Sequence, residues 1–284
     1  MTQSRNVVSI QTGQPTSDGA GVKLTRVFGG AGIEAFDPFL MLDEFGSDKP
    51  DDYIAGFPPH PHRGFETVTY MLEGRMRHED HMGNVGLLQG GGVQWMTAAR
   101  GVIHSEMPEQ EEGVMRGFQL WLNLPGKSKM GAASYDDIQP ERIPRVTTQQ
   151  GVDVVVIAGQ FDDGQLQQAG VVQRPDTEPQ YFDIHLPAGA HISPRVPDGH
   201  RVLLYVYEGE LQIAGHAQGV GKGRLARLSD TGDITLSSTS GARVLLIAGK
   251  PLNEPVVQYG PFVMNTREEI EQALRDFRND ALTA

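Results

Sequence analysis

Short apolar runs, broken at close intervals by glycine or proline, cover most of the chain. In residues 116–125 (RGFQLWLNLP), Phe118, Leu120 and Leu122 recur at every second position, the period of a strand with one buried face. Residues 7–13 (VVSIQTG) and 21–30 (GVKLTRVFGG) are similar short runs between glycine-containing breaks. The pattern predicts an all-β fold with many turns and little helix.

Two strand pairs are predicted in the first half of the chain. Thr67–Leu72 is rich in residues that favour strands, Glu73-Gly74 forms a turn and Met76–Glu79 returns, so we expect a hairpin here. Met82–Asn84 predicts a further turn. The glycine-bounded segment 86–101 then predicts a second pair of strands.

The composition changes after residue 125, where 126–150 carries scattered charge, two prolines and few apolar residues. Such a stretch is typical of a connection between domains. We therefore expect an N-terminal domain over 1–130, a linker over 131–149 and a second strand-rich domain over 150–284. The chain should end in one amphipathic helix, which a capping box formed by Thr266 and Glu269 would begin.

Composition excludes several classes of site. The 284 residues carry a formal charge of −12, which argues against direct binding of nucleic acid, because that depends on clustered lysine and arginine. The chain has no cysteine, so disulfides, zinc-thiolate sites and cysteine nucleophiles are ruled out. It also has no signal-like N-terminus and no apolar run long enough to span a membrane, so we expect a cytoplasmic protein.

The residues that could bind a metal ion or take part in catalysis are concentrated between Gly56 and Glu106. His60 and His62 are spaced i, i+2, and so are His104 and Glu106. On extended strands this spacing puts both members of a pair on the same face. Two such strands side by side would present three imidazoles and a carboxylate to one point, which we interpret as a metal ion.

A site of this kind would be catalytic rather than structural. Three neutral imidazoles and one carboxylate leave a divalent ion with residual positive charge and, if it is octahedral, with two open positions. A structural zinc would be closed by four ligands. Iron, manganese, copper, nickel, cobalt and zinc all accept such a ligand set. The alternative is that these are surface histidines in a proline-rich loop and an ordinary polar strand edge.

Other polar and aromatic residues carry weaker signals. Glu66 is either a hydrogen-bond partner of the ligands or a base, and the sequence leaves its role open. We expect the remaining histidines to be structural, with the first two solvated: His78, His81, His185, His191, His200 and His216. Four aromatic residues either line a substrate pocket or belong to the core: Phe57, Phe65, Trp95 and Trp121.

A weak internal repeat relates the two halves. Residues 68–76 (VTYMLEGRM) can be laid over 203–211 (LLYVYEGEL), which predicts a duplicated β-unit. The same offset puts Arg195 and Pro197 at the places of His60 and His62. Only the first half is therefore expected to keep the metal ligands.

The motifs resemble those of a known family. GFPPHPHRGFETVTYMLEG and RGVIHSEMP look like the two cupin motifs, although the asparagine that usually ends the second is absent and Glu106 stands in its place. The first motif is also one residue longer between Glu66 and Gly74 than is general for cupins. Together with DPFLMLDEF, FQLWLNLP and YGPFVMNTREEIEQALRDF, they resemble the pirin family over nearly the whole chain.

The resemblance implies two cupin-type barrels (double-stranded β-helix, or jelly-roll) packed face to face, with a C-terminal helix. It implies one metal ion, usually iron(II), in the first barrel. The family's ligands fall on His60, His62, His104 and Glu106, all of which are present.

The resemblance also implies an activity and an alternative to it. Some bacterial pirins are associated with quercetin 2,3-dioxygenase activity, in which dioxygen opens a flavonol to a depside and carbon monoxide. The enolate of the substrate would bind the metal, and Glu106 would take its proton. The alternative is a metal-containing regulatory protein that acts through protein partners without turnover, and a third option is another metal-dependent cupin enzyme. We expect a monomer with a small aromatic substrate.

Overall fold

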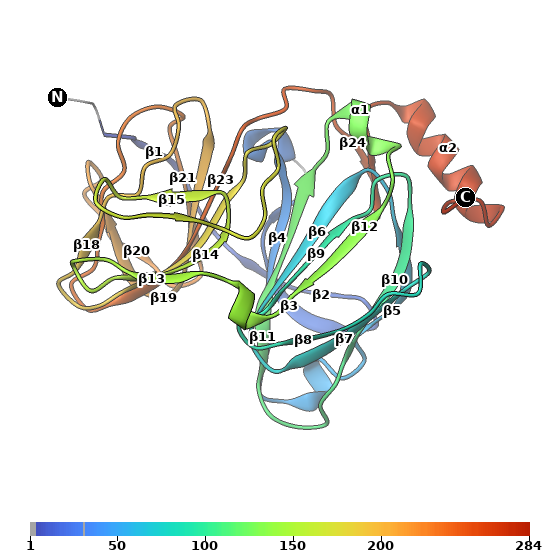
Figure 1. The fold of residues 1–284 in the computed structure, drawn as a ribbon, viewed down its shortest axis with the longest axis horizontal. Coiled ribbons are helices and arrows are strands. Elements are labelled where there is room, and N and C mark those ends of the chain that lie inside the picture. The colour runs from blue at the N-terminus through green and yellow to red at the C-terminus, as the bar shows by residue number, and fades with distance from the viewer. Residues whose placement is uncertain (1–3, 31) are drawn as a thin grey trace. The chain divides into compact units, whose positions relative to one another are not determined.

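The computed structural model describes residues 4–30 and 32–284, and these form two compact units (Figure 1). The site unit consists of Gln14–Pro140 and Leu252–Ala284. The companion unit consists of the residues up to Gly13 and of Glu141–Pro251. Strands dominate both units, which confirms the expected all-β class. Among the described residues, no helix is long and apolar enough to cross a membrane.

Two antiparallel sheets build the site unit. Within its described part, the larger has the strand order β12 (Ser134–Ile138), β9 (Val93–Thr97), β6 (Phe65–Glu73), β11 (Met115–Asn123), β4 (Phe39–Ser47), β3 (Val22–Gly29) and β2 (Gln14–Asp18). The smaller has the order β5 (Phe57–His62), β10 (Val102–Pro108), β7 (Arg75–Asp80) and β8 (Val85–Gln89). The short hairpin of β24 (Val257–Tyr259) and β25 (Phe262–Met264) precedes α2 (Arg267–Arg278), and α1 (Gly126–Lys129) follows β11.

The predicted pairing of the strands in the first half is wrong. Thr67–Leu72 and Met76–Glu79 do lie in strands, but β6 belongs to the larger sheet and β7 to the smaller. Gly74 joins them with φ +92°, and a Cβ there would lie 2.9 Å from the carbonyl oxygen of Val114. Only glycine fits this sheet-to-sheet turn. In the same way β8 and β9 lie in different sheets. The spacing of apolar residues predicts which face of a strand is buried, but it does not predict which strand pairs with it.

The companion unit repeats this plan. Its main path is β1 (Val7–Thr12), β21 (Arg224–Leu228), β19 (Arg201–Ile213), β23 (Ala242–Gly249), β17 (Gln180–Leu186), β14 (Asp153–Ala158) and β13 (Arg145–Thr147). Shorter strands flank it: β15 (Gln160–Asp162), β16 (Gln167–Ala169), β18 (His191–Ile192), β20 (Val220–Gly221) and β22 (Leu236–Ser237). In the described chain, 3-10 turns lie in the site unit at Ile33–Phe36 and Pro50–Asp52, and another at Pro140–Arg142 spans the boundary in sequence between the two units.

The internal repeat has a structural counterpart. The first half of β19 pairs with β21 and β23, as β6 pairs with β9 and β11. Its second half pairs with β20 and β22, as β7 pairs with β8 and β10. Gly209, with φ +71°, stands at the junction, as Gly74 does in the site unit. The interior of the companion unit is filled by one cluster of aliphatic and aromatic side chains that includes Val154, Phe182 and Leu204.

The two ends of the chain lie in units other than the expected ones. The boundaries 1–130, 131–149 and 150–284 assumed that each unit is continuous in sequence. β1, however, pairs with β21 and so extends the companion sheet, whereas Leu252–Ala284 belongs to the site unit. Long-range pairing of an edge strand leaves no local signal in composition, so the sequence could not show this exchange.

Two buried cations tie the C-terminal segment to the site unit. The Arg63 guanidinium donates hydrogen bonds to Asp276 of α2 at 2.7 Å and to the carbonyl oxygen of Leu282 at 3.0 Å. Lys129 Nζ donates to the carbonyl oxygens of Gly64 and Val263 and to the side chain of Asn123. Burial lowers the pKa of Lys129 to about 7. The predicted helix is confirmed as α2, and its capping box is present.

Replacing Lys129 by methionine should destabilise the protein. The change leaves three buried oxygen acceptors without the ammonium that they share, and we expect a loss of roughly 2–4 kcal/mol in the free energy of unfolding. Chemical denaturation measures it. Lys127→Met, at an exposed position of the same short helix, is the matched control and should change stability little. Equal stability of the two variants would contradict the role given to Lys129.

Candidate metal centre

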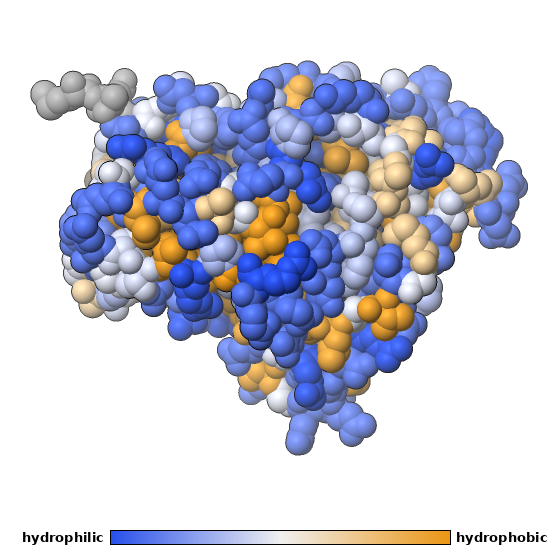
Figure 2. Space-filling model, in the orientation of Figure 1, coloured by the Kyte–Doolittle hydropathy of each residue, from blue (hydrophilic) through white to orange (hydrophobic). Residues whose placement is uncertain are grey.

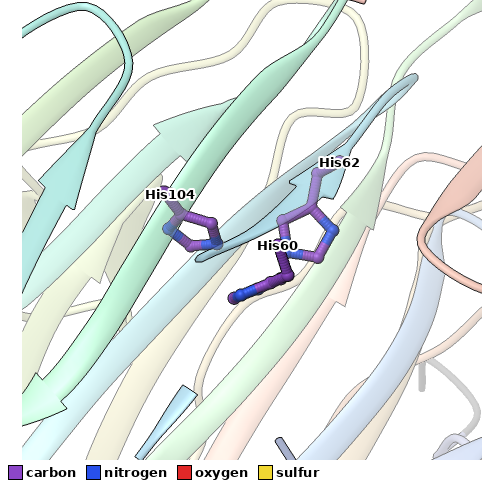
Figure 3. A group of neighbouring side chains, drawn as sticks. All are labelled: His60, His62 and His104. Carbon is purple, nitrogen blue, oxygen red and sulfur yellow. The ribbon is translucent and has the colours of Figure 1, made fainter. Parts of the chain in front are cut away.

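The three histidines of the predicted ligand set come together in the site unit. His60 and His62 lie on β5, and His104 lies on the neighbouring strand β10, where it pairs directly with His60. One ligand atom from each ring lies within 4.8 Å of those of the other two. The ring centroids are 4.4 Å apart for His60 and His104, and 5.0 Å apart for His62 and His104. Figure 3 shows the three imidazoles gathered from the two strands.

The donor atoms fit a cation. His60 Nδ1 lies 2.8 Å from the carbonyl oxygen of Pro58, and His104 Nδ1 lies 3.3 Å from His78 Nδ1, so in both rings Nε2 remains for a ligand role. His62 Nδ1 and His104 Nε2 are buried and have no hydrogen-bond partner among the described residues. Buried polar atoms of this kind normally have partners, and a metal ion would supply one.

The surroundings of His62 and His104 favour the neutral form of both rings. Burial lowers the pKa of His62 well below its ordinary value, and the neighbouring His60 lowers it further. The pKa of His104 is also lowered well below the ordinary value, first by burial and then by His62, His60 and His78. A neutral imidazole has the lone pair that a metal requires. His62 and His104 are therefore in their ligand form at neutral pH.

Glu106 lies beside this group but not within it. It follows His104 by two residues on β10, after an irregularity in the pairing of β10 with β5. Its carboxylate is buried, and Oε1 accepts a hydrogen bond of 3.0 Å from the hydroxyl of Thr69. The group of mutually close ligand atoms in the described chain contains the three histidines only. Coordination by Glu106 stays a prediction.

Glu66 takes part in a separate contact. Its side chain is buried and accepts a 2.6 Å hydrogen bond from the hydroxyl of Thr97 on β9. It is not one of the residues that line the cavity described below.

The expectation that His78 is solvated is wrong. The ring is fully buried, because Met76 and His78 form the inward face of β7 while Arg77 and Glu79 are exposed. Its Nδ1 faces His104 Nδ1 at 3.3 Å. The alternation of β7 was the signal that could have shown this, since it puts His78 on the same face as an apolar residue. His81, as expected, is exposed.

A cavity of about 640 Å³ opens onto the site. His60, His62 and Glu106 line it, and so do Phe57 and Trp121. Further apolar side chains form its walls: Leu24, Met41, Phe45 and Met76. The β24–β25 hairpin adds Gln258, Gly260 and Pro261. Of the four aromatic residues singled out in the sequence, Phe57 and Trp121 thus line the pocket, whereas Phe65 and Trp95 are buried in the core.

A row of polar side chains crosses one wall of the cavity. Gln119 on β11 is the cross-strand neighbour of both Thr69 on β6 and Asp43 on β4. Arg26 on β3 donates two hydrogen bonds to Asp43, at 2.9 and 2.8 Å. The row adds hydrogen-bonding groups to a cavity that is also lined by apolar side chains, and Thr69 connects it to Glu106. The outer surface in Figure 2 is, by contrast, mostly hydrophilic with scattered apolar patches.

The sequence and the structure are similar to those of known pirins and of proteins named quercetin 2,3-dioxygenase. Residues 21–122 match the family model described as pirin, and residues 181–283 match that of the pirin C-terminal cupin domain. A Pseudomonas aeruginosa protein named "Putative quercetin 2,3-dioxygenase" is 68% identical over 99% of both chains. Human pirin is 40% identical over 98% of this chain and 94% of its own. The solved structure of quercetin 2,3-dioxygenase from Acinetobacter baumannii superposes with a TM-score of 0.91, at 32% identity over 99% of both chains.

Proposed function

The chain belongs to the pirin family of cupin proteins, and we propose that it is a mononuclear metal-dependent dioxygenase that opens flavonols such as quercetin with dioxygen. One observation carries the proposal. Three imidazoles lie close together, and His62 and His104 each have a buried nitrogen without a hydrogen-bond partner among the described residues. His60, His62 and the buried carboxylate of Glu106 line a cavity large enough for an aromatic substrate. The names of the relatives favour the same activity.

His60, His62 and His104 would hold the metal, with Glu106 as a fourth ligand. Iron(II) is our first expectation, and manganese, copper, nickel, cobalt and zinc are alternatives. Bound there, such an ion would supply Lewis-acid and redox chemistry to an enolate and to dioxygen.

The protein's own residues have three tasks in this proposal. Glu106 takes the proton from the 3-hydroxyl group of the flavonol, which makes it the catalytic base. Phe57, Trp121 and the aliphatic side chains around them hold the rings of the substrate and exclude water. Gln119 and the Arg26–Asp43 pair offer hydrogen bonds to the polar edge of the substrate.

Thr69 should position the catalytic carboxylate. Its hydroxyl lies 3.0 Å from Glu106 Oε1 and 2.5 Å from the side-chain amide of Gln119. The amide atom of Gln119 nearest to this hydroxyl in the structure is Oε1. Because a hydroxyl has one proton and cannot donate to two oxygens, we assign the Gln119 amide in its flipped orientation, in which its NH₂ group donates to Thr69 and Thr69 donates to Glu106. The carboxylate is then held by a short chain of hydrogen bonds.

Thr69→Val should therefore lower turnover roughly five- to tenfold, which corresponds to the loss of about one hydrogen bond of 1–1.4 kcal/mol. Metal content should stay that of the wild type. Steady-state oxygen consumption with quercetin measures the effect. Thr67→Val is the matched control, because Thr67 is buried two residues earlier on β6 and its hydroxyl has no hydrogen-bond partner among the described residues. Equal rates for the two variants would remove Thr69 from this role.

The alternative is a metal-containing regulatory protein that acts through protein partners without turnover. The net charge of −12 favours protein partners over DNA. Oxygen consumption by the iron-loaded protein, with and without quercetin, separates the two functions. The dioxygenase predicts uptake that depends on the flavonol, and a flat trace from fully loaded protein would favour the regulator. The monomeric state and the cytoplasmic location remain predictions.

A further inference from the structure

We propose that His78 and Asp80 on β7 are positioning residues, which fix the tautomer and the ring plane of His104 so that its Nε2 faces the metal. The inference rests on the proposed metal centre and adds residues outside its ligand set. β7 is the neighbour of β10, with His104 opposite Asp80 and Glu106 opposite His78. The strand order of the smaller sheet thus puts β5 and its ligands on one side of β10 and this pair on the other.

The contacts form a continuous line from Asp80 to His104. His78 Nε2 lies 3.3 Å from Asp80 Oδ2, and His78 Nδ1 lies 3.3 Å from His104 Nδ1. The side chains of His78 and Asp80 are both fully buried. Water therefore does not compete for these hydrogen bonds, and each one restricts the next ring.

The surroundings of Asp80 determine which group donates and which accepts in each of these hydrogen bonds. Its Oδ1 accepts from the backbone N–H groups of Met82 and Asn84, at 2.9 and 3.1 Å, and its Oδ2 accepts from the side-chain amide of Asn84 at 2.8 Å. A carboxyl group surrounded by donors acts as an acceptor, so His78 must donate to it from Nε2.

A His78 ring that carries its single proton on Nε2 has its lone pair on Nδ1, where it can accept from Nδ1–H of His104. This leaves the lone pair of His104 on Nε2, the buried atom that lacks a partner among the described residues. The opposite direction would put a proton on this Nε2, buried and without an acceptor. Only the first arrangement both satisfies the hydrogen bonds and prepares His104 as a ligand.

Tyr135 fixes the plane of the His78 ring. The two rings stack with centroids 4.2 Å apart and an interplanar angle of 11°. Tyr135 lies on β12, in the larger sheet, and its hydroxyl accepts a 3.2 Å hydrogen bond from Gln94. His78 is thus held on one side by a ring and on the other by His104. Outer groups of this kind orient metal-binding histidines, and losing one typically costs 10- to 100-fold in metal affinity.

The test is the affinity for cobalt(II), measured by competition with a chromophoric chelator. His78→Leu removes the acceptor and should weaken cobalt(II) binding about 10- to 100-fold. His78→Asn places an amide oxygen near the position of Nδ1 and should restore affinity to within a few-fold. His191→Leu, at an exposed position of the companion unit, is the control and should bind as the wild type does. The d–d absorption of the bound cobalt should change in His78→Leu and not in the control.

Wild-type affinity in His78→Leu, or equal weakening in the leucine and asparagine variants, would overturn the inference and leave the metal centre standing. A wild-type protein that binds no cobalt(II) would overturn both. Should His78→Leu fail to fold, long-range ¹H–¹⁵N spectra of the zinc-loaded wild type decide the matter. Metal on His104 Nε2 with protons on His104 Nδ1 and His78 Nε2 supports the inference, and coordination through His104 Nδ1 contradicts it. Neither the cobalt(II) affinity nor the ¹H–¹⁵N spectra depend on flavonol turnover. Both therefore test the positioning of His104 separately from the proposed reaction.

Discussion

Replacing His104 by alanine should abolish stoichiometric metal binding. His104 is the one imidazole that β10 contributes to the group, and without it the two histidines of β5 remain as an i, i+2 pair beside a carboxylate that already accepts from Thr69. Two imidazoles alone bind a first-row divalent ion weakly in competition with water and buffer. We expect metal content to fall from about one ion per chain to less than about 0.1 after dialysis against a chelator, because the closed set of donors is lost.

Elemental analysis of the purified, iron-loaded proteins measures this directly. His191→Ala is the matched control, since His191 is an exposed histidine of the companion unit and should keep the full metal content. Flavonol-dependent oxygen uptake should disappear together with the metal. A His104→Ala protein that still holds one ion per chain would show that the imidazole group is not the binding site.

Replacing Glu106 by glutamine should keep part of the metal and lose most of the turnover. The amide is nearly the same size as the carboxylate and can still accept a hydrogen bond from Thr69, but it cannot take the proton of the flavonol hydroxyl. General base catalysis contributes on the order of 10²–10⁴ in rate, so we expect a fall of at least about 100-fold in kcat. The three imidazoles remain, and metal occupancy should decrease only in part.

Turnover measured per bound metal ion separates the two effects. Glu109→Gln, at an exposed position just beyond β10, controls for the change of charge and should leave the rate unaltered. Unchanged turnover in Glu106→Gln would refute the base role. A complete loss of metal would instead make Glu106 chiefly a ligand, although in the structure its carboxylate lies outside the group of mutually close donor atoms.

The sequence predicted that the three histidines lie close together because the information on which this depends is local. An i, i+2 spacing on a strand fixes the shared face of His60 and His62, and of His104 and Glu106, and the strands that carry them are neighbours in the sheet. The capping box of α2 is local in the same sense, since Thr266 and Glu269 satisfy each other across one turn.

What the sequence did not show depends on contacts between distant segments. At Gly74 the chain passes from β6 in the larger sheet to β7 in the smaller one. Two strands of one hairpin would show the same alternation of apolar and polar side chains, so the sequence does not distinguish the two arrangements. The same applies to the pairing of β1 with β21. The contacts of His78 were missed because they join it to His104 on β10 and to Tyr135 on β12, neither of which is near it in the chain.

The most direct test of the account is X-ray absorption spectroscopy at the metal edge of the iron-loaded protein. The structure predicts one ion per chain whose nearest shell contains three imidazole nitrogens, together with oxygen ligands that include a carboxylate or an exchangeable solvent molecule. Addition of quercetin should change the oxygen part of that shell and leave the imidazoles in place. A spectrum with oxygen ligands alone, or with fewer than three imidazoles at full occupancy, would contradict the central claim that His60, His62 and His104 hold a single open metal site.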